Sequence, residues 1–200
     1  MIAGNQQAGV ATIAIFPLNL VLFPGGALPL KIFEQRYQHM TKTCLRDDVP
    51  FGVCRIRSGQ EVGAPAEHEP IGCSARIIDW EMPHPGLFHL HCVGEAVFHV
   101  IHSRIEGSGL IRGDVEWLVD NSGDSVDRRD FDICRSTLER VFEHAGTRFV
   151  STPTAFDDPE WVSFRLAEII PVATQIKQDL LEQRSSARRI SAIAKLLQSA

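Results

Sequence analysis

Prolines and glycines interrupt the most apolar stretch of the chain at short intervals, and this punctuation restricts what the first part of the sequence can form. Apolar residues fill most of 13–32, but Pro17 and Asn19 break the run early and Pro24-Gly25-Gly26 breaks it again. Proline lacks a backbone donor and disfavours a helix interior, whereas glycine permits the positive φ of a sharp turn. The stretch therefore predicts short extended segments joined by a turn, and it is too interrupted to span a bilayer.

The sequence continues up to residue 119 as short segments whose composition suits strands. The clearest alternation lies at 110–119, where Ile111, Val115, Trp117 and Val119 share one face. Turn-forming residues at 83–86 join two segments as a hairpin, and 61–70 is predicted to be a loop. In this part of the chain, strands are predicted over 51–56, 71–80, 87–93, 96–103 and 110–119. Gly94 separates the strand at 87–93 from the strand at 96–103. Short strands at this spacing indicate a compact sheet or barrel rather than alternating strands and helices.

Helical periodicity is present at 33–47 and dominates after residue 124. Phe33, Tyr37, Met40 and Cys44 recur at intervals of three or four residues, which places them on one face of a helix. Further helices are predicted over 124–145, 157–170 and 174–182, and a last helix begins at Ser185 or Ser186 and carries an apolar stripe up to Leu197. The predicted organisation is an α+β chain, with a β domain at residues 12–119 and an all-helical subdomain at residues 124–200.

Two neighbouring segments carry a resemblance to a known family. Residues 16–25 read FPLNLVLFPG and residues 28–37 read LPLKIFEQRY, and this string resembles the opening of the Lon amino-terminal substrate-binding domain. Weaker likenesses follow in the same order at 50–53, 71–75, 93–100, 161–167 and 177–182, with Val97 where the family usually has an arginine. The resemblance implies a PUA-like β pseudo-barrel followed by an all-helical bundle, and a role in recognising unfolded or damaged protein.

The same string supplies the candidate site residues, for which two interpretations are open. In the first, the motif determines the fold, through Phe16, Pro17, Leu18, Pro29, Phe33, Glu34 and Arg36. In the second, the turn after Phe23 exposes an apolar lip to partners, through Leu22, Phe23, Pro24, Gly25 and Tyr37. The expected partner is an unfolded or extended polypeptide. It would bind in a groove between barrel and helices, or add a strand to an exposed sheet edge.

Two motifs that would indicate catalysis do not occur in the sequence. The 200 residues contain no GxxxxGK[ST] phosphate-binding loop and no GxSxG nucleophile motif. We therefore expect a non-catalytic module without a cofactor. It would carry neither the ATPase nor the peptidase that the resemblance associates with the complete Lon machine.

Histidines in two neighbouring predicted strands leave a small hydrolase or a metal-binding protein as an alternative. His89 and His91 should share one face and Cys92 should lie on the other, which disfavours a thiol–imidazole pair. His99 and His102 are three residues apart and should face opposite ways, and no acidic or Cys partner has metal-ligand spacing. We expect a half-exposed strand face rich in histidine, with no metal ligand and no catalytic residue.

Charge and cysteine content bear on the partners and the compartment. The formal net charge of −5 gives little support to nucleic-acid binding, which needs clustered Lys and Arg. An RNA-associated PUA-like module is a further alternative, because Lys177, Arg184, Arg188 and Lys195 could line one helical stripe. The five cysteines form no CxxC pair and no signal peptide is visible, so we expect a cytoplasmic protein without a membrane segment.

Overall fold

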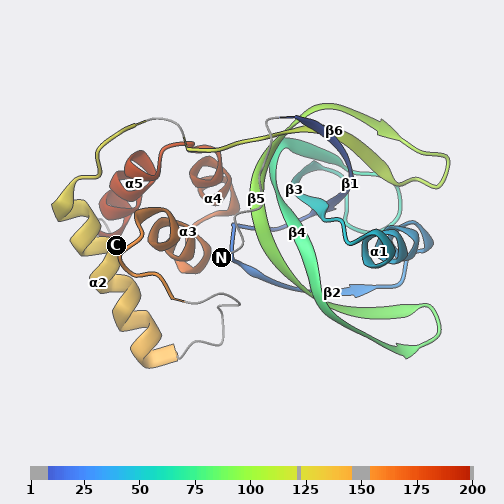
Figure 1. The fold of residues 1–200 in the computed structure, drawn as a ribbon, viewed down its shortest axis with the longest axis horizontal. Coiled ribbons are helices and arrows are strands. Elements are labelled where there is room, and N and C mark those ends of the chain that lie inside the picture. Colours follow the sequence, from blue (N-terminus) through green and yellow to red (C-terminus); the bar gives the residue numbers. More distant parts are fainter. Residues whose placement is uncertain (1–8, 121–122, 146–153, 199–200) are drawn as a thin grey trace.

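The strands occupy the first part of the chain and most of the helices follow them, as the computed structural model shows (Figure 1). The structure describes residues 9–120, 123–145 and 154–198. Its elements in chain order are β1 (Val10–Leu18), β2 (Ala27–Ile32), α1 (Gln35–Asp47), β3 (Phe51–Ser58), β4 (Glu67–His84), β5 (Leu87–Ile105), β6 (Ile111–Trp117), α2 (Arg128–Ala145), α3 (Pro159–Ile169), α4 (Thr174–Glu182) and α5 (Ser186–Gln198). The predicted α+β class is confirmed.

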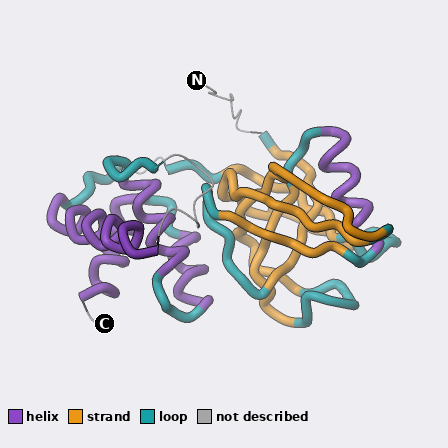
Figure 2. Tube along the Cα trace, turned by 90° about the horizontal axis from the view of Figure 1, so that it is seen from below, coloured by secondary structure: helices purple, strands orange, loops and turns teal. Residues whose placement is uncertain are grey.

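The strands form one mixed sheet that closes on itself. Their order is β2-β5-β4-β3-β1-β6, and β5 also pairs with β6, so that β5, β4, β3, β1 and β6 make a ring with no open edge between them. The pairing of β1 with β3 is parallel, and the others are antiparallel. Figure 2 shows the barrel at one end of the molecule and helices α2 to α5 at the other.

Strand β5 is longer than predicted and changes its neighbour along one side. It runs through Gly94 without a break, whereas the sequence suggested two strands separated at that glycine. Its first part pairs with β2, ending at Ala27↔Val93, and its second part pairs with β6, beginning at Phe98↔Trp117. Gly94 thus marks a change of partner and not a turn.

The local sequence patterns gave wrong positions for three other boundaries: the end of β1 and the starts of β4 and α2. Strand β1 continues through Pro17, whose missing amide proton is tolerated because pairing with β6 has already ended at Ile15. Strand β4 begins at Glu67, inside the predicted loop. Helix α2 begins at Arg128 and not near residue 124. The carboxylate that accepts a backbone N–H in its first turn belongs to Asp127, at 2.9 Å from Asp130 N.

Phe33 does not belong to the apolar face of α1, contrary to the periodicity. The helix starts at Gln35 with Glu34 as its N-cap, and the side chain of Phe33 is 55% exposed. Tyr37, Met40 and Cys44 do face the core, as predicted. Three of the four residues in the pattern were therefore correct, and the error lies at the helix start, where the pattern cannot locate the cap.

The cores of barrel and helices meet at two adjacent side chains. Leu22 packs in the cluster beneath α1 with Leu28 and Phe51, whereas Phe23 packs with Leu138 and Phe164 in the helical cluster. Leu22 is 4% exposed and Phe23 is fully buried. The segment before the Pro24-Gly25 turn therefore anchors both halves. The division into domains at 12–119 and 124–200 stays a prediction.

Backbone hydrogen bonds fix this turn against β5. Gly26 N donates to Phe23 O at 2.9 Å, Gly25 N donates to Gly94 O at 2.7 Å, and Gly94 N donates to Gly26 O at 2.9 Å. From the helical side, the guanidinium of Arg165 donates to Pro24 O. The backbones approach closely because residue 94 has no side chain, since a Cβ there would lie 2.2 Å from Phe23 O.

Gly94→Ala is expected to lower the free energy of unfolding by about 3 kcal/mol, because the new methyl group must displace backbone atoms of the turn. Chemical denaturation monitored by tryptophan fluorescence measures this loss. The matched control is Gly107→Ala, where an added Cβ meets nothing within 4 Å, and its stability should change by less than about 0.5 kcal/mol. Equal stability of the two variants would contradict the close approach at Gly94.

Candidate functional site: a groove between barrel and helices

A groove of about 640 Å³ lies between the barrel and the first turns of α3. It lies beside the part of β5 where the pairing partner changes from β2 to β6. Its lining therefore includes the β5 segment from Val93 to Val97 and the Pro24-Gly25 turn. The end of β6 is tied to this segment by a hydrogen bond from Leu118 N to Val97 O at 2.9 Å. The fold thus leaves a concave surface at the junction of its two halves.

The floor of the groove is apolar and comes from three elements. Val97 and Phe164 are buried, Leu118 and Trp161 are half-buried, and Val119 is 46% exposed. Val119 was predicted to share the inner face of a strand, but β6 ends at Trp117 and the side chain of Val119 faces the groove instead. A surface of this kind suits the burial of apolar side chains from a ligand.

Carboxylates form the polar part of the lining. Glu95, Asp120, Asp158 and Glu160 are exposed, and no Lys or Arg is among the described residues that line the groove. Asp158 is the N-cap of α3, and its side chain accepts a hydrogen bond from Glu160 N at 2.9 Å. Partial desolvation raises the pKa of Glu160, and the charge of Arg189 opposes that rise.

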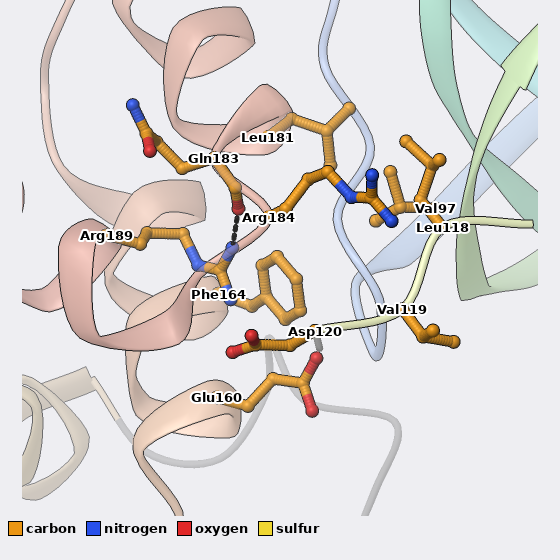
Figure 3. A pocket seen from close by; sticks show the side chains of 10 residues that line it. All are labelled: Val97, Leu118, Val119, Asp120, Glu160, Phe164, Leu181, Gln183, Arg184 and Arg189. Carbon is orange, nitrogen blue, oxygen red and sulfur yellow. Dashed lines mark hydrogen bonds between the residues drawn. The ribbon is translucent and has the colours of Figure 1, made fainter. Parts of the chain in front are cut away.

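The buried guanidinium of Arg189 packs against Phe164, one of the floor residues. In the narrow cavity beside the groove, the guanidinium of Arg189 lies over the ring of Phe164, 3.8 Å from its centroid (Figure 3). Its Nε donates to Ser163 Oγ at 2.8 Å, and it also donates to Gln183 O. Burial lowers the pKa of Arg189 to about 10, and the carboxylates of Glu160 and Asp120 counteract this. Arg189 therefore remains charged at neutral pH and fixes the position of Phe164.

The structure divides the five residues predicted to bind a partner into two groups. Pro24 and Gly25 are partly exposed and line the groove. Leu22, Phe23 and Tyr37 are buried in the two cores, so a partner does not reach their side chains in this conformation. That these five residues bind a partner stays a prediction. Of the five, only Pro24 and Gly25 lie at the surface.

The motif residues assigned to the fold mostly lie around α1. Phe16 packs on Tyr37, with 4.2 Å between ring centroids, and the guanidinium of Arg36 lies 4.5 Å from the centroid of the same ring. Arg36 also pairs with Glu34 at 3.0 Å and donates to Gly109 O at 3.2 Å. The other members are Pro17 and Leu18, which are buried at the end of β1, Pro29, which is exposed on β2, and Phe33, which is exposed before α1.

Sequence reasoning missed most of the groove. The missed residues are Val93, Gly94, Glu95, Ala96, Val97, Leu118, Val119, Asp120, Asp158, Glu160, Trp161 and Phe164. They come from β5, from the segment after β6 and from the start of α3, and only the tertiary fold brings them together. One signal was available, because helix α3 carries an apolar residue on nearly every side and so must face more than one surface.

The histidine-rich strands are arranged differently from the prediction. His89 and His91 share the outer face of β5, and Cys92 is buried on the inner face, as predicted. His99 and His102 also share a face, which corrects the expectation that they point opposite ways. A bulge at Ile101 places them opposite Glu116 and Asp114, two residues apart on β6. Within the described residues, no three His, Cys, Asp or Glu side chains converge as metal ligands would.

The stripe of basic residues considered for RNA is partly occupied by other contacts. Lys177 Nζ donates to Glu168 O at 2.6 Å, and Arg188 pairs with Asp124 at 3.0 Å. Arg184 lines the narrow cavity beside Arg189. No helix among the described residues is long and apolar enough to cross a membrane.

The closed β barrel with a helical bundle beside it agrees with the PUA-like α+β fold that the resemblance implied. The family model described as the ATP-dependent protease La (LON) substrate-binding domain matches residues 12–199. The chain belongs to this family, as its amino-terminal string indicated.

The relatives found by sequence are whole Lon proteases. The chain is 24% identical over 204 residues to a Lon protease of Paraburkholderia phytofirmans and 28% identical over 204 residues to Lon protease 2 of Myxococcus xanthus. Each alignment covers 96% of this chain but only 25% and 24% of the relative. The chain therefore spans about a quarter of the length of the curated relatives it matches.

Solved structures share the fold over nearly the whole chain. The crystal structure of a Lon N-terminal domain protein from Xanthomonas campestris superposes with a TM-score of 0.75 at 29% identity, covering 92% of this chain and 96% of that one. The N-terminal domain of a Mycobacterium avium complex Lon protease has a TM-score of 0.65 and covers 92% of this chain and 97% of that one. Its 11% identity shows the fold alone.

The five cysteines should be unreactive while the protein is folded. All are free thiols and buried, and burial raises the pKa of Cys44 to about 11 and those of Cys92 and Cys134 to about 12. Burial also raises the pKa values of Cys54 and Cys73. A raised pKa lowers the thiolate fraction, which for Cys44 at pH 8 is about one in a thousand.

An Ellman titration at pH 8 is therefore expected to detect almost no fast-reacting thiol in the native chain, and all five after unfolding in guanidinium chloride. One native thiol that reacted as fast as free cysteine would revive the thiol hydrolase alternative.

Proposed function

We propose that the chain binds unfolded or extended polypeptide in the groove between barrel and helices, as a substrate-recognition module. The observation that carries the proposal is an apolar-floored groove of about 640 Å³ at the junction of the two halves, in a chain whose family is described as a substrate-binding domain. An unfolded chain differs from a folded one in its exposed apolar side chains, and these are what such a floor can cover.

The backbone beside the floor supports an extended ligand. Between Val93 and Phe98 one side of β5 has no strand partner, because β2 has ended and β6 has not begun. In this interval Gly94 bonds the turn, Val97 O accepts from Leu118 N and Ala96 N donates to Ser74 Oγ, so only a short part of the edge remains for a partner. We therefore expect side-chain burial, with a few backbone hydrogen bonds, to provide most of the affinity.

The module is proposed to be non-catalytic and to work in a reducing cytoplasm. Five buried free thiols suit that compartment. The curated relatives are Lon proteases, and a recognition step in proteolysis is the corresponding proposal for this chain.

Val119→Gln is expected to weaken binding of a permanently unfolded protein, such as reduced and carboxymethylated lactalbumin, about fivefold. The physical reason is the loss of about 1 kcal/mol of apolar burial. Val119 is 46% exposed in the free protein, so the substitution should leave stability unchanged. Fluorescence anisotropy with labelled lactalbumin measures the dissociation constant.

Two further variants make the test specific for the groove. Val62→Gln is the matched control, because Val62 is 55% exposed and lies outside the groove, and its affinity should equal that of the unsubstituted chain. Trp80→Gln tests a competing surface, because Ile78, Trp80 and Met82 are exposed on the β4–β5 hairpin. A loss of binding with Trp80→Gln but not with Val119→Gln would place the site on that hairpin and reject the groove.

A further inference from the structure

We infer that the groove selects polypeptide segments in which apolar residues are flanked by lysine or arginine. The inference rests on the proposed function, because it specifies which segments that same groove prefers. It is carried by the chemistry of the lining: of the groove residues in the described part of the chain, every charged one is a carboxylate.

The four carboxylates border the apolar floor on two sides. Glu95 belongs to β5, Asp120 follows β6, and Asp158 and Glu160 belong to the start of α3. Figure 3 shows Asp120 and Glu160 next to each other beside the ring of Phe164. A ligand whose apolar side chain packs on Val119 or Trp161 therefore brings its neighbouring residues within reach of acidic groups from both halves of the protein.

Glu95 and Asp158 keep acceptor capacity despite their internal contacts. Glu95 Oε1 accepts from Arg76 at 2.5 Å, and Asp120 Oδ2 accepts from Ser186 N at 2.8 Å. One oxygen of Asp158 caps α3. Each ionised carboxylate has about four lone-pair positions, so the contacts of Glu95 and Asp158 leave room for a ligand ammonium or guanidinium.

The arginines near the groove are not among its described lining residues. Arg189 is 2% exposed and lies behind Phe164. Arg76 is bonded to Asp48 as well as to Glu95. Arg184 is exposed and lines the adjoining narrow cavity, which shares Val97 and Leu118 with the groove. The charged residues that line the groove itself, within the described part of the chain, are therefore all acidic, which favours basic flanks and repels acidic ones.

Three labelled peptides test the inference. They share a Phe-Leu-Phe centre, which is flanked on both sides by pairs of lysines, serines or glutamates. At low ionic strength we expect the lysine peptide to bind about tenfold tighter than the serine peptide, from two or three partly exposed ion pairs, and the glutamate peptide to bind weakest. In about 0.5 M salt the lysine and serine peptides should bind almost equally, because screening removes the charge term.

The double variant Glu95→Gln/Glu160→Gln assigns the preference to the groove. It should reduce the ratio of lysine to serine affinities to about twofold or less, because two of the four charges are gone. The matched control is Glu116→Gln/Glu143→Gln, which removes the same charge from exposed residues outside the groove. The control should keep the full ratio.

The outcomes separate this inference from the proposed function. Equal binding of the lysine and serine peptides at low salt, together with binding of unfolded lactalbumin, would overturn the charge preference and leave the polypeptide function standing. A ratio that falls equally in both double variants would show a long-range effect of net charge and overturn the assignment to the groove. Failure of all peptides and of lactalbumin would overturn both proposals. Self-association that excludes the peptides would show that a second copy covers the groove, and would also overturn the inference.

Discussion

The reciprocal hydrogen bonds between Gly94 and the Gly25-Gly26 turn are the contact on which the rest of the structure depends. They bring two backbones so close that a Cβ at residue 94 would lie 2.2 Å from Phe23 O. This close approach fixes the directions of two side chains. Leu22 points into the core beneath α1, and Phe23 points into the helical core. Arg165 completes the junction, because it reaches from α3 to the carbonyl of Pro24.

The groove is a consequence of this junction. The turn occupies the side of β5 where β2 ends, and pairing with β6 begins at Phe98, four residues beyond Gly94. Helix α3 packs against the turn through Arg165 and against the interval in β5 through Phe164 and Val97. The remaining surface is concave, apolar at its base and acidic at its rim. The same residues that hold the halves together therefore border the surface proposed to bind polypeptide.

The sequence allowed the architecture to be predicted but not the site. The Phe16–Tyr37 string carried the family resemblance, and the helical periodicity of 37–44 identified the core face of α1 correctly. Periodicity failed where the register changes, as at the bulge that places His99 and His102 on one face. It also failed at Val119, beyond the end of β6, because alternation has meaning only while a strand continues.

Prediction of the groove required contacts between distant segments. Pro24, Glu95, Val119 and Trp161 come from four parts of the chain, and no local pattern relates them. The apolar composition around the turn indicated an interaction surface, but Leu22, Phe23 and Tyr37 pack in the interior instead. Apolar residues in a motif serve the core more often than the surface, and the acidic rim follows only from the positions of β5 and α3.

The most direct test of the account is the map of backbone amide shifts when reduced, carboxymethylated lactalbumin is added to ¹⁵N-labelled protein. The account predicts that the largest shifts belong to Gly25, Glu95, Ala96, Val119 and Trp161, with little change along the outer face of β5 at His89 and His91. Shifts concentrated on the β4–β5 hairpin or the histidine face, with the groove amides unmoved, would contradict it.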